Sequence, residues 1–242
     1  MRTIPRARLA VAAVGVVAVG LLSGCGVAEE GVRPGVAASV ADATINVADV
    51  EEAAEDRCQV LGELAQEDDQ PVSGARIRDL ALQGEVLREV ATQLGEEYGV
   101  ESSQLYKDAQ AEIRSQLAGI DDEDLVDRAV QSLSSTDYFV DILIQVGREE
   151  LGISESEDPD GQQGFAQGLE IAQQWQDEHP IETNPRYSGM EIGDPDEGVI
   201  TTRNDVSTAV SDFAREALGA AEDPLAEDPA YAASLPESQR CG

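Results

Sequence analysis

The sequence contains a single lysine, Lys107, and a single histidine, His179. Its 16 basic residues stand against 49 acidic ones, which gives a formal net charge of −33. Nucleic-acid binding needs clustered lysine and arginine side chains that neutralise phosphates, so this composition excludes nucleic acid as a partner. The excess of carboxylates keeps the chain soluble, and a second interpretation is that it attracts basic polypeptides or cations.

The lack of histidine and cysteine clusters also excludes most catalytic chemistry. His179 precedes Pro180, and neither a Gly-x-Ser-x-Gly elbow nor a second histidine accompanies it. Glycine motifs for phosphates or dinucleotides are missing, and so is the cysteine and histidine set of a zinc site. A calcium loop starting at Ser156 would place Asp158 and Asp160 correctly but lacks both anchoring carboxylates. We predict no enzyme activity, no cofactor, no metal site and no small-molecule substrate.

The first residues are basic and then apolar. Three arginines among the first eight residues precede an apolar run of fourteen residues, from Leu9 to Leu22. This layout is typical of an export signal. The run is shorter than the roughly 20 residues that a helix needs to cross a membrane. We therefore expect residues 1–24 to be a signal peptide.

The apolar run ends in Leu22-Ser23-Gly24-Cys25, which resembles the bacterial lipobox. The resemblance implies cleavage between Gly24 and Cys25 and a diacylglycerol on the cysteine. The alternative is an ordinary signal peptide with a cysteine near the cut. Each buried methylene contributes about 0.8 kcal/mol, so two acyl chains give stable anchoring. We expect a protein on the outer face of the bacterial cell membrane, held there by a flexible, glycine-rich tether at residues 25–35.

Lipidation of Cys25 leaves Cys58 and Cys241 in an exported chain. Because the compartment outside the membrane is oxidising, a disulfide between these two is the natural pairing. The chain-entropy model gives such a bond about 5 kcal/mol of stabilisation. The alternative interpretation leaves Cys58 as a buried thiol and Cys241 at a frayed end.

Apolar periodicity predicts that most of the remaining chain is helical. Predicted helices follow Asn46, Ser73, Ser102 or Ser103, and the acidic cluster 121–124, and others cover 138–146 and 165–175. Gly99 is a predicted stop, and a last helix is expected over 205–221. The segment 138–146 is apolar except at Asp141 and Gln145, so we expect it to be the most buried helix. Before these helices, Ala38–Val40 and Ala43–Ile45 flank a turn and predict a hairpin.

Two segments resemble a known family. The hairpin and helix start over Ala38–Val50 resemble the opening of SurA-type extracytoplasmic folding factors. The residues Asn184, Pro185, Arg186 and Tyr187 resemble the Asn-Pro-Arg-Tyr-Gly segment of SurA N-terminal-domain lipoproteins of high-GC Gram-positive bacteria. In that family the segment forms a strand that returns to the hairpin. Here Ser188 intervenes before the glycine.

The resemblance implies a mainly α fold, a bundle of about six helices with a small β element that pairs the N-terminal hairpin with a late strand. It covers most of residues 36–192, the expected helical chaperone-type domain. Residues 193–242 would then be a C-terminal extension, partly helical and tied back by the disulfide.

The family's function implies a chaperone-like domain that holds unfolded exported polypeptides. Relatives also carry parvulin-type prolyl isomerase modules, but the predicted helices leave no room for one, so we predict no isomerase activity. Four large side chains are candidates for lining a client groove, although aromatics at helical spacing are commonly core residues: Tyr138, Phe139, Phe165 and Trp175. The alternative function is a structural or accessory envelope lipoprotein that binds one folded partner.

Overall fold

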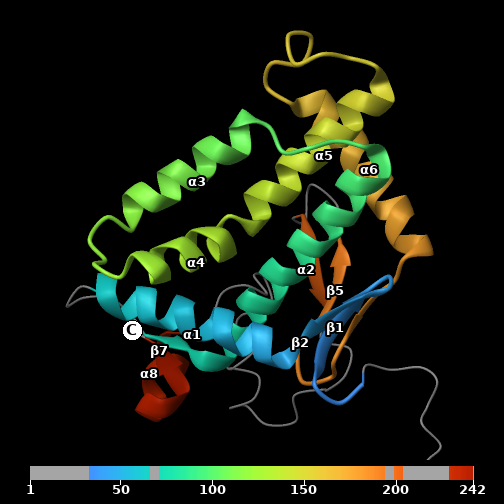
Figure 1. Ribbon diagram of the computed structural model, residues 1–242. Coiled ribbons are helices and arrows are strands. Elements are labelled where there is room, and N and C mark those ends of the chain that lie inside the picture. Colours follow the sequence, from blue (N-terminus) through green and yellow to red (C-terminus); the bar gives the residue numbers. More distant parts are fainter. Residues whose placement is uncertain (1–32, 66–70, 194–198, 204–228, 242) are drawn as a thin grey trace, which may run out of the picture. The chain divides into compact units, whose positions relative to one another are not determined.

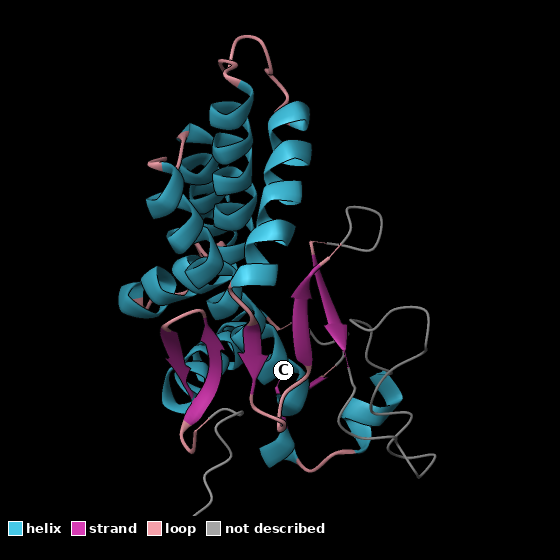
Figure 2. Cartoon of the chain, turned by 90° about the vertical axis from the view of Figure 1, so that its right-hand side faces the viewer, coloured by secondary structure: helices cyan, strands magenta, loops and turns pink. Residues whose placement is uncertain are grey.

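The computed structural model describes residues 33–65, 71–193, 199–203 and 229–241. The described chain is mainly helical, with small antiparallel sheets gathered at one end of the helices (Figures 1 and 2). This confirms the predicted fold class. The signal peptide, Cys25, most of the tether and the helix expected over 205–221 lie outside the described residues.

The N-terminal hairpin forms as predicted and is part of a three-stranded sheet. Strand β1 (Val36–Val40) lies between β2 (Ala43–Asn46) and β4 (Ile181–Thr183), and both pairings are antiparallel. Ala38 lies opposite Ile45 on one side and Thr183 on the other. A late strand therefore returns to the hairpin, and it places the end of the helical region beside its beginning.

The returning strand is not the four-residue motif that the sequence had suggested. Residues 184–187 form the turn after β4. Pro185 has no N–H to give to a ladder, and the Asn184 side chain accepts from the backbone N–H of Arg186 at 3.1 Å, which favours a turn over a strand. Asn184 still connects to the hairpin, because its backbone N–H donates to Ala37 O at 2.8 Å and its Nδ2 to Val36 O at 3.0 Å.

The first two long helices begin where their capping residues predict, and the second also ends at its predicted stop. Helix α1 (Val47–Leu64) starts after Asn46, whose backbone N–H and Nδ2 both donate to the Asp49 carboxylate. Strand β3 (Val72–Ser73) leads into α2 (Gly74–Tyr98), where the Ser73 hydroxyl accepts from Arg76 N. Helix α2 ends at Gly99, which adopts the left-handed conformation that ends many helices, with φ of 66°.

Helices α3 (Gln104–Gln116) and α4 (Glu123–Leu133) form a hairpin beside α1, and a second, small apolar cluster joins the hairpin to α1. That cluster contains Val60, Leu117, Ile120, Leu125, Val126, Ala129 and Val130. Two arginines attach the end of α4 to the body of the protein. Arg57 donates to Ser132 O at 2.9 Å, and Arg88 donates to Gln131 O. Cations at this position suit the negative end of a helix.

Helices α5 (Ser135–Leu151) and α6 (Gln162–Glu178) pack against each other and form the middle of the main core with α2. Helix α5 buries eight of its residues, in agreement with its apolar sequence. The contact with α6 is close because three glycines lie in it. A Cβ atom on Gly147 would overlap the carbonyl oxygen of Gly164, and one on Gly168 would overlap that of Leu143.

Some of the described residues after Ile192 contribute to the same core. Strand β5 (Gly189–Ile192) pairs with β6 (Ile200–Arg203), and Ile200 is buried with the helices. The chain then continues through α8 (Pro229–Ser234), the short helix η1 (Glu237–Gln239) and β7 (Arg240–Cys241), which pairs with β3. The core therefore extends past the boundary expected at residue 192.

Candidate functional site

A cavity of about 610 Å³ lies where the end of α2 meets the starts of α3 and α5. We call it the α2–α3 groove. Its lining residues are Thr92, Gly95 and Glu96 of α2, Gly99, Val100, Glu101 and Ser102 of the connecting loop, Lys107 of α3, and Tyr138 of α5. Gly99 contributes to the opening, because a Cβ atom at that position would have no other atom within 4 Å.

The wall formed by α3 is attached to α5 through a buried carboxylate. Asp141 has no exposed surface, and it accepts from both the backbone N–H and the hydroxyl of Ser103 at 2.6 Å. The Ser103 hydroxyl in turn accepts from Leu105 N and so caps α3. Asp141 is the one acidic residue of the apolar segment 138–146, and these hydrogen bonds explain its presence there. The carboxylate fixes where α3 begins and therefore where the groove lies.

Tyr138 lies between the core and the groove. Its ring centroid lies 5.0 Å from that of Tyr106, and the guanidinium of Arg88 lies 5.6 Å from the Tyr138 ring centroid. The hydroxyl of Tyr106 lies 3.3 Å from that of Ser134 at the start of α5. Tyr138 is half-buried, so its ring is held by these contacts and still offers apolar surface to the groove.

The other three aromatic residues expected in a client groove lie elsewhere. Phe139 has no exposed surface, and Phe165 packs against the main core. Trp175 is 6% exposed, donates from Nε1 to the Glu97 carboxylate at 3.0 Å and stacks on His179. Neighbouring positions on a helix point about 100° apart. Tyr138 can therefore face the groove while Phe139, the next residue, faces the core.

Several acidic side chains lie at the same end of α2. Glu96 and Glu101 line the groove, and Glu97 is adjacent to them in the chain. Burial raises the pKa of the Tyr98 hydroxyl, and the carboxylates of Glu97 and Glu150 raise it further. The electrostatic potential around the end of α2 is therefore negative.

His179 has a structural position. It is the C-terminal capping residue of α6, where its backbone N–H donates to Trp175 O and its Nδ1 lies 3.0 Å from the same oxygen. Its ring stacks on that of Trp175 at a centroid distance of 4.5 Å. The only histidine in the sequence therefore ends a helix, as the Pro180 that follows it suggests.

The acidic loop between α5 and α6 has a structural use for its central carboxylate. The Asp158 side chain is fully buried, accepts from Gln163 N and Gly164 N at the start of α6, and pairs with Arg148. Its oxygens are therefore occupied by the start of α6 and by Arg148. Within the residues that the structure describes, no group of three or more His, Cys, Asp or Glu side chains is arranged to hold a metal ion.

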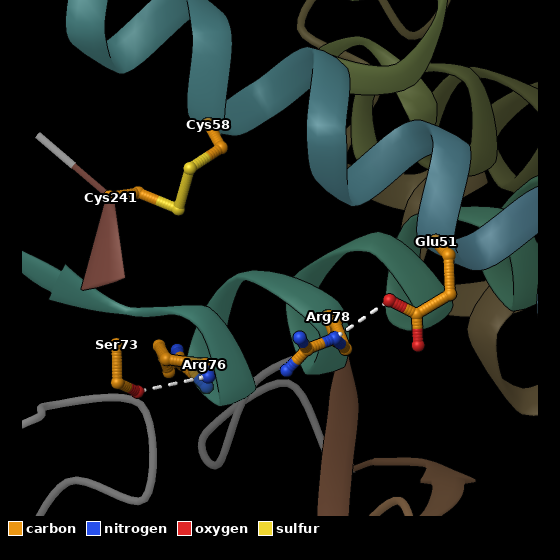
Figure 3. The surroundings of a disulfide bond; sticks show 6 residues. All are labelled: Glu51, Cys58, Ser73, Arg76, Arg78 and Cys241. Carbon is orange, nitrogen blue, oxygen red and sulfur yellow. Dashed lines mark hydrogen bonds and ion pairs between the residues drawn. A yellow bond between two sulfur atoms is a disulfide. The ribbon is translucent and has the colours of Figure 1, made fainter. Parts of the chain in front are cut away.

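Cys58 and Cys241 form a disulfide in the structure. Figure 3 shows the bond joining α1 to β7, next to α2, whose Arg78 pairs with Glu51 at 2.8 Å. A smaller cavity of about 220 Å³ lies beside the bond, between α1, α2 and the C-terminal residues. Strand β7 pairs with β3 beside the disulfide, Cys241 opposite Val72 and Arg240 opposite Ser73. The C-terminal segment is thus attached to the first two helices.

Of the residues that line the groove, only Tyr138 was predicted from the sequence as a groove residue. The signal that was present is Gly99, whose role as a helix stop was predicted, together with the serine caps at Ser102 or Ser103. These two features mark a sharp turn between helices. They do not give the angle between α2 and α3, and this angle decides whether a cavity forms at the turn.

Comparison with known proteins gives no further guide, because no family model, curated protein or solved structure matches this chain. Among the described helices, none combines the length and the apolar composition that crossing a membrane requires.

Proposed function

We propose that the protein is a membrane-anchored extracytoplasmic lipoprotein that holds non-native segments of exported polypeptides and does not catalyse their isomerisation. The observation that carries the proposal is the α2–α3 groove. It combines an aromatic ring, exposed loop backbone and hydroxyl groups around a cavity of about 610 Å³. Such a surface accepts extended segments of many sequences, because it does not require one fixed set of partners.

The position of the late strand supports the SurA-type part of the proposal. That resemblance implies a strand that returns to the N-terminal hairpin, and β4 pairs with β1. The motif residue Asn184 binds the same hairpin through Val36 O and Ala37 O. These two contacts support the resemblance from which the proposed holding function is taken.

The proposed anchor rests on the sequence around Cys25. A lipid on this cysteine and a tether over residues 25–35 would hold the helical domain at the outer face of the membrane. The net charge of −33 repels anionic headgroups, so the domain would stand off the surface, where exported chains emerge.

Suppression of aggregation tests the proposed holding activity. The mature protein should reduce light scattering by several unrelated unfolded proteins. Ser102→Trp places a large side chain in the groove and should abolish most of this effect. Ala166→Trp adds the same side chain at an exposed position on α6 and should retain the effect.

Three results would contradict the proposal. They are no suppression by the unchanged protein, equal suppression by Ser102→Trp, and proline isomerisation above that of heat-inactivated protein. Co-purification with one stoichiometric folded partner, without any suppression of aggregation, would instead favour an accessory envelope lipoprotein.

A further inference from the structure

We infer that the α2–α3 groove selects segments that carry lysine or arginine, so that the preferred clients are basic stretches of unfolded polypeptide. This inference rests on the proposed holding function and names its substrate class. It depends on three features of the groove: a helix end, two carboxylates, and an apolar wall next to them.

The first feature is the C-terminal end of α2. The N–H groups of Gly99 and Val100 both donate to Gly95 O. Among the described residues, no backbone N–H donates to the carbonyl oxygens of Glu96, Glu97 or Tyr98. Free carbonyls in the last turn give a helix its negative end, which favours a positive charge. A cation bound in this groove would lie at that end.

The second feature is a pair of carboxylates on the groove wall. Glu96 belongs to the last turn of α2 and Glu101 to the loop that follows, and both side chains are exposed. Neither forms an ion pair with a basic side chain in the described part of the chain. Both carboxylates are therefore available to a positively charged ligand.

The third feature is the apolar surface beside these charges. Tyr138 and Val100 line the groove together with Glu96 and Glu101. Lysine and arginine side chains have an apolar stem and a charged end, and they lie along apolar surface while the charge reaches polar groups. The groove offers both surfaces, so it suits these residues better than it suits purely apolar or acidic ones.

Lys107 of α3 also lines the groove and provides an internal test of the idea. It is the only lysine in the sequence, and within the described residues it makes no ion pair. Its ammonium group therefore adds a positive charge to a groove that we propose to bind positive charges. Removing this charge should strengthen binding, whereas removing the carboxylates should weaken it.

The charge of the whole chain supports the same choice of client. A net charge of −33 attracts basic polypeptides over long range and repels acidic ones, which raises the rate of encounter with the first kind. The groove then supplies the local contacts. The long-range attraction and the local contacts in the groove therefore both favour basic segments.

Peptide binding to the mature protein tests the inference. The probe is a short, labelled, disordered peptide of lysine, serine and leucine, compared with the same peptide in which glutamate replaces every lysine. We expect at least tenfold tighter binding of the lysine peptide. Raising the ionic strength from about 0.01 M to 0.15 M shortens the Debye length from about 30 Å to 8 Å and should reduce this difference.

Variants separate the groove from the overall charge. Glu96→Gln with Glu101→Gln should weaken binding of the lysine peptide by about three- to tenfold, because partly exposed ion pairs are individually weak. Lys107→Gln should strengthen it. The matched control, Glu63→Gln with Glu178→Gln, removes two exposed carboxylates outside the groove and should leave binding nearly unchanged.

Equal affinity for the two peptides would overturn the inference, and so would equal weakening in the control variant, which would assign the preference to net charge alone. Either result leaves the holding function intact if the unchanged protein still suppresses aggregation and Ser102→Trp does not. If aggregation is not suppressed at all, the proposed function fails first. The two failures are therefore distinguishable.

Discussion

Helices α5 and α6 are held by close packing of their backbones, whereas α3 is held mainly by hydrogen bonds at its start. Between α5 and α6, glycines at 147, 164 and 168 let the two backbones touch. Helix α3 buries one side chain, Tyr106, and leaves Leu105 54% exposed. Its start depends on the hydrogen bonds between Ser103 and Asp141. Close packing holds α5 and α6 together, whereas the less completely packed α3 leaves exposed surface beside it.

The largest effect should come from adding a methyl group between α5 and α6. Gly168→Ala places a Cβ atom onto the carbonyl oxygen of Leu143, so a backbone must move. We expect a loss of about 3 kcal/mol in the free energy of unfolding, measured by urea denaturation. Gly62→Ala is the control, because a Cβ atom there, in the last turn of α1, meets nothing within 4 Å. It should stabilise the protein by less than about 1 kcal/mol. Equal effects of the two changes would disprove the close contact.

A smaller and more local effect should follow from loosening α3. Asp141→Asn replaces a carboxylate oxygen that accepts from Ser103 with an amide and leaves a buried donor without its partner. We expect a loss of about 2 kcal/mol. Amide hydrogen exchange should accelerate in α3 more than in α5.

Asp127→Asn is the matched control for this change. It removes the same charge from an exposed pair with Arg114 and should change the free energy of unfolding by less than about 1 kcal/mol. Uniform acceleration of hydrogen exchange across α3 and α5 in Asp141→Asn would show that α3 is not attached separately.

The smallest effects concern pH, and Asp158 in the α5–α6 loop and Glu85 on α2 should change stability in opposite directions. Burial acts to raise the pKa of Asp158 in the α5–α6 loop. Backbone N–H groups of Gly164 and Gln163, together with Arg148, outweigh burial and hold the pKa below 3.8. The stability contributed by Asp158 is therefore complete above pH 3.8 and is lost as the pH falls through the lower folded value.

Glu85 of α2 behaves in the opposite way. Burial raises its pKa above 4.5, although Arg88 and Arg57 oppose this. Its contribution to stability therefore increases as the pH falls toward 4.5. In urea denaturation at several pH values, the unchanged protein should gain free energy of unfolding as the pH falls toward 4.5, and Glu85→Gln should lack this increase. Asp158→Asn should reduce the loss below pH 3.8. Parallel pH profiles for both variants and the unchanged protein would contradict the assignment.

Local signals in the sequence predicted the elements of the fold well. Asn46 with Asp49 marks the start of α1, and Gly99 marks the end of α2, because caps act within a few residues. The apolar segment 138–146 correctly predicted a buried helix. These predictions depend on interactions between neighbours in the chain.

The groove could not be predicted in the same way, because it depends on contacts between distant residues. Asp141 stands 38 residues from Ser103, and no periodicity pairs them. The returning strand was expected at the Asn184 motif and instead precedes it, because Pro185 and the Asn184 side chain favour a turn. The sequence identifies the large aromatic side chains. It does not show that Tyr138, unlike the others, lines the groove.

The disulfide between Cys58 and Cys241 also constrains the order in which the protein can mature. Cys241 follows Cys58 by 183 residues, so α1 is complete in the growing chain long before its covalent partner exists. During that interval Cys58 cannot form this disulfide, so α1 must fold without it. The bond closes only when the C-terminal residues reach β3. It therefore distinguishes a chain that includes Cys241 from a shorter one, and β7 is locked to α1 only after synthesis has passed Cys241.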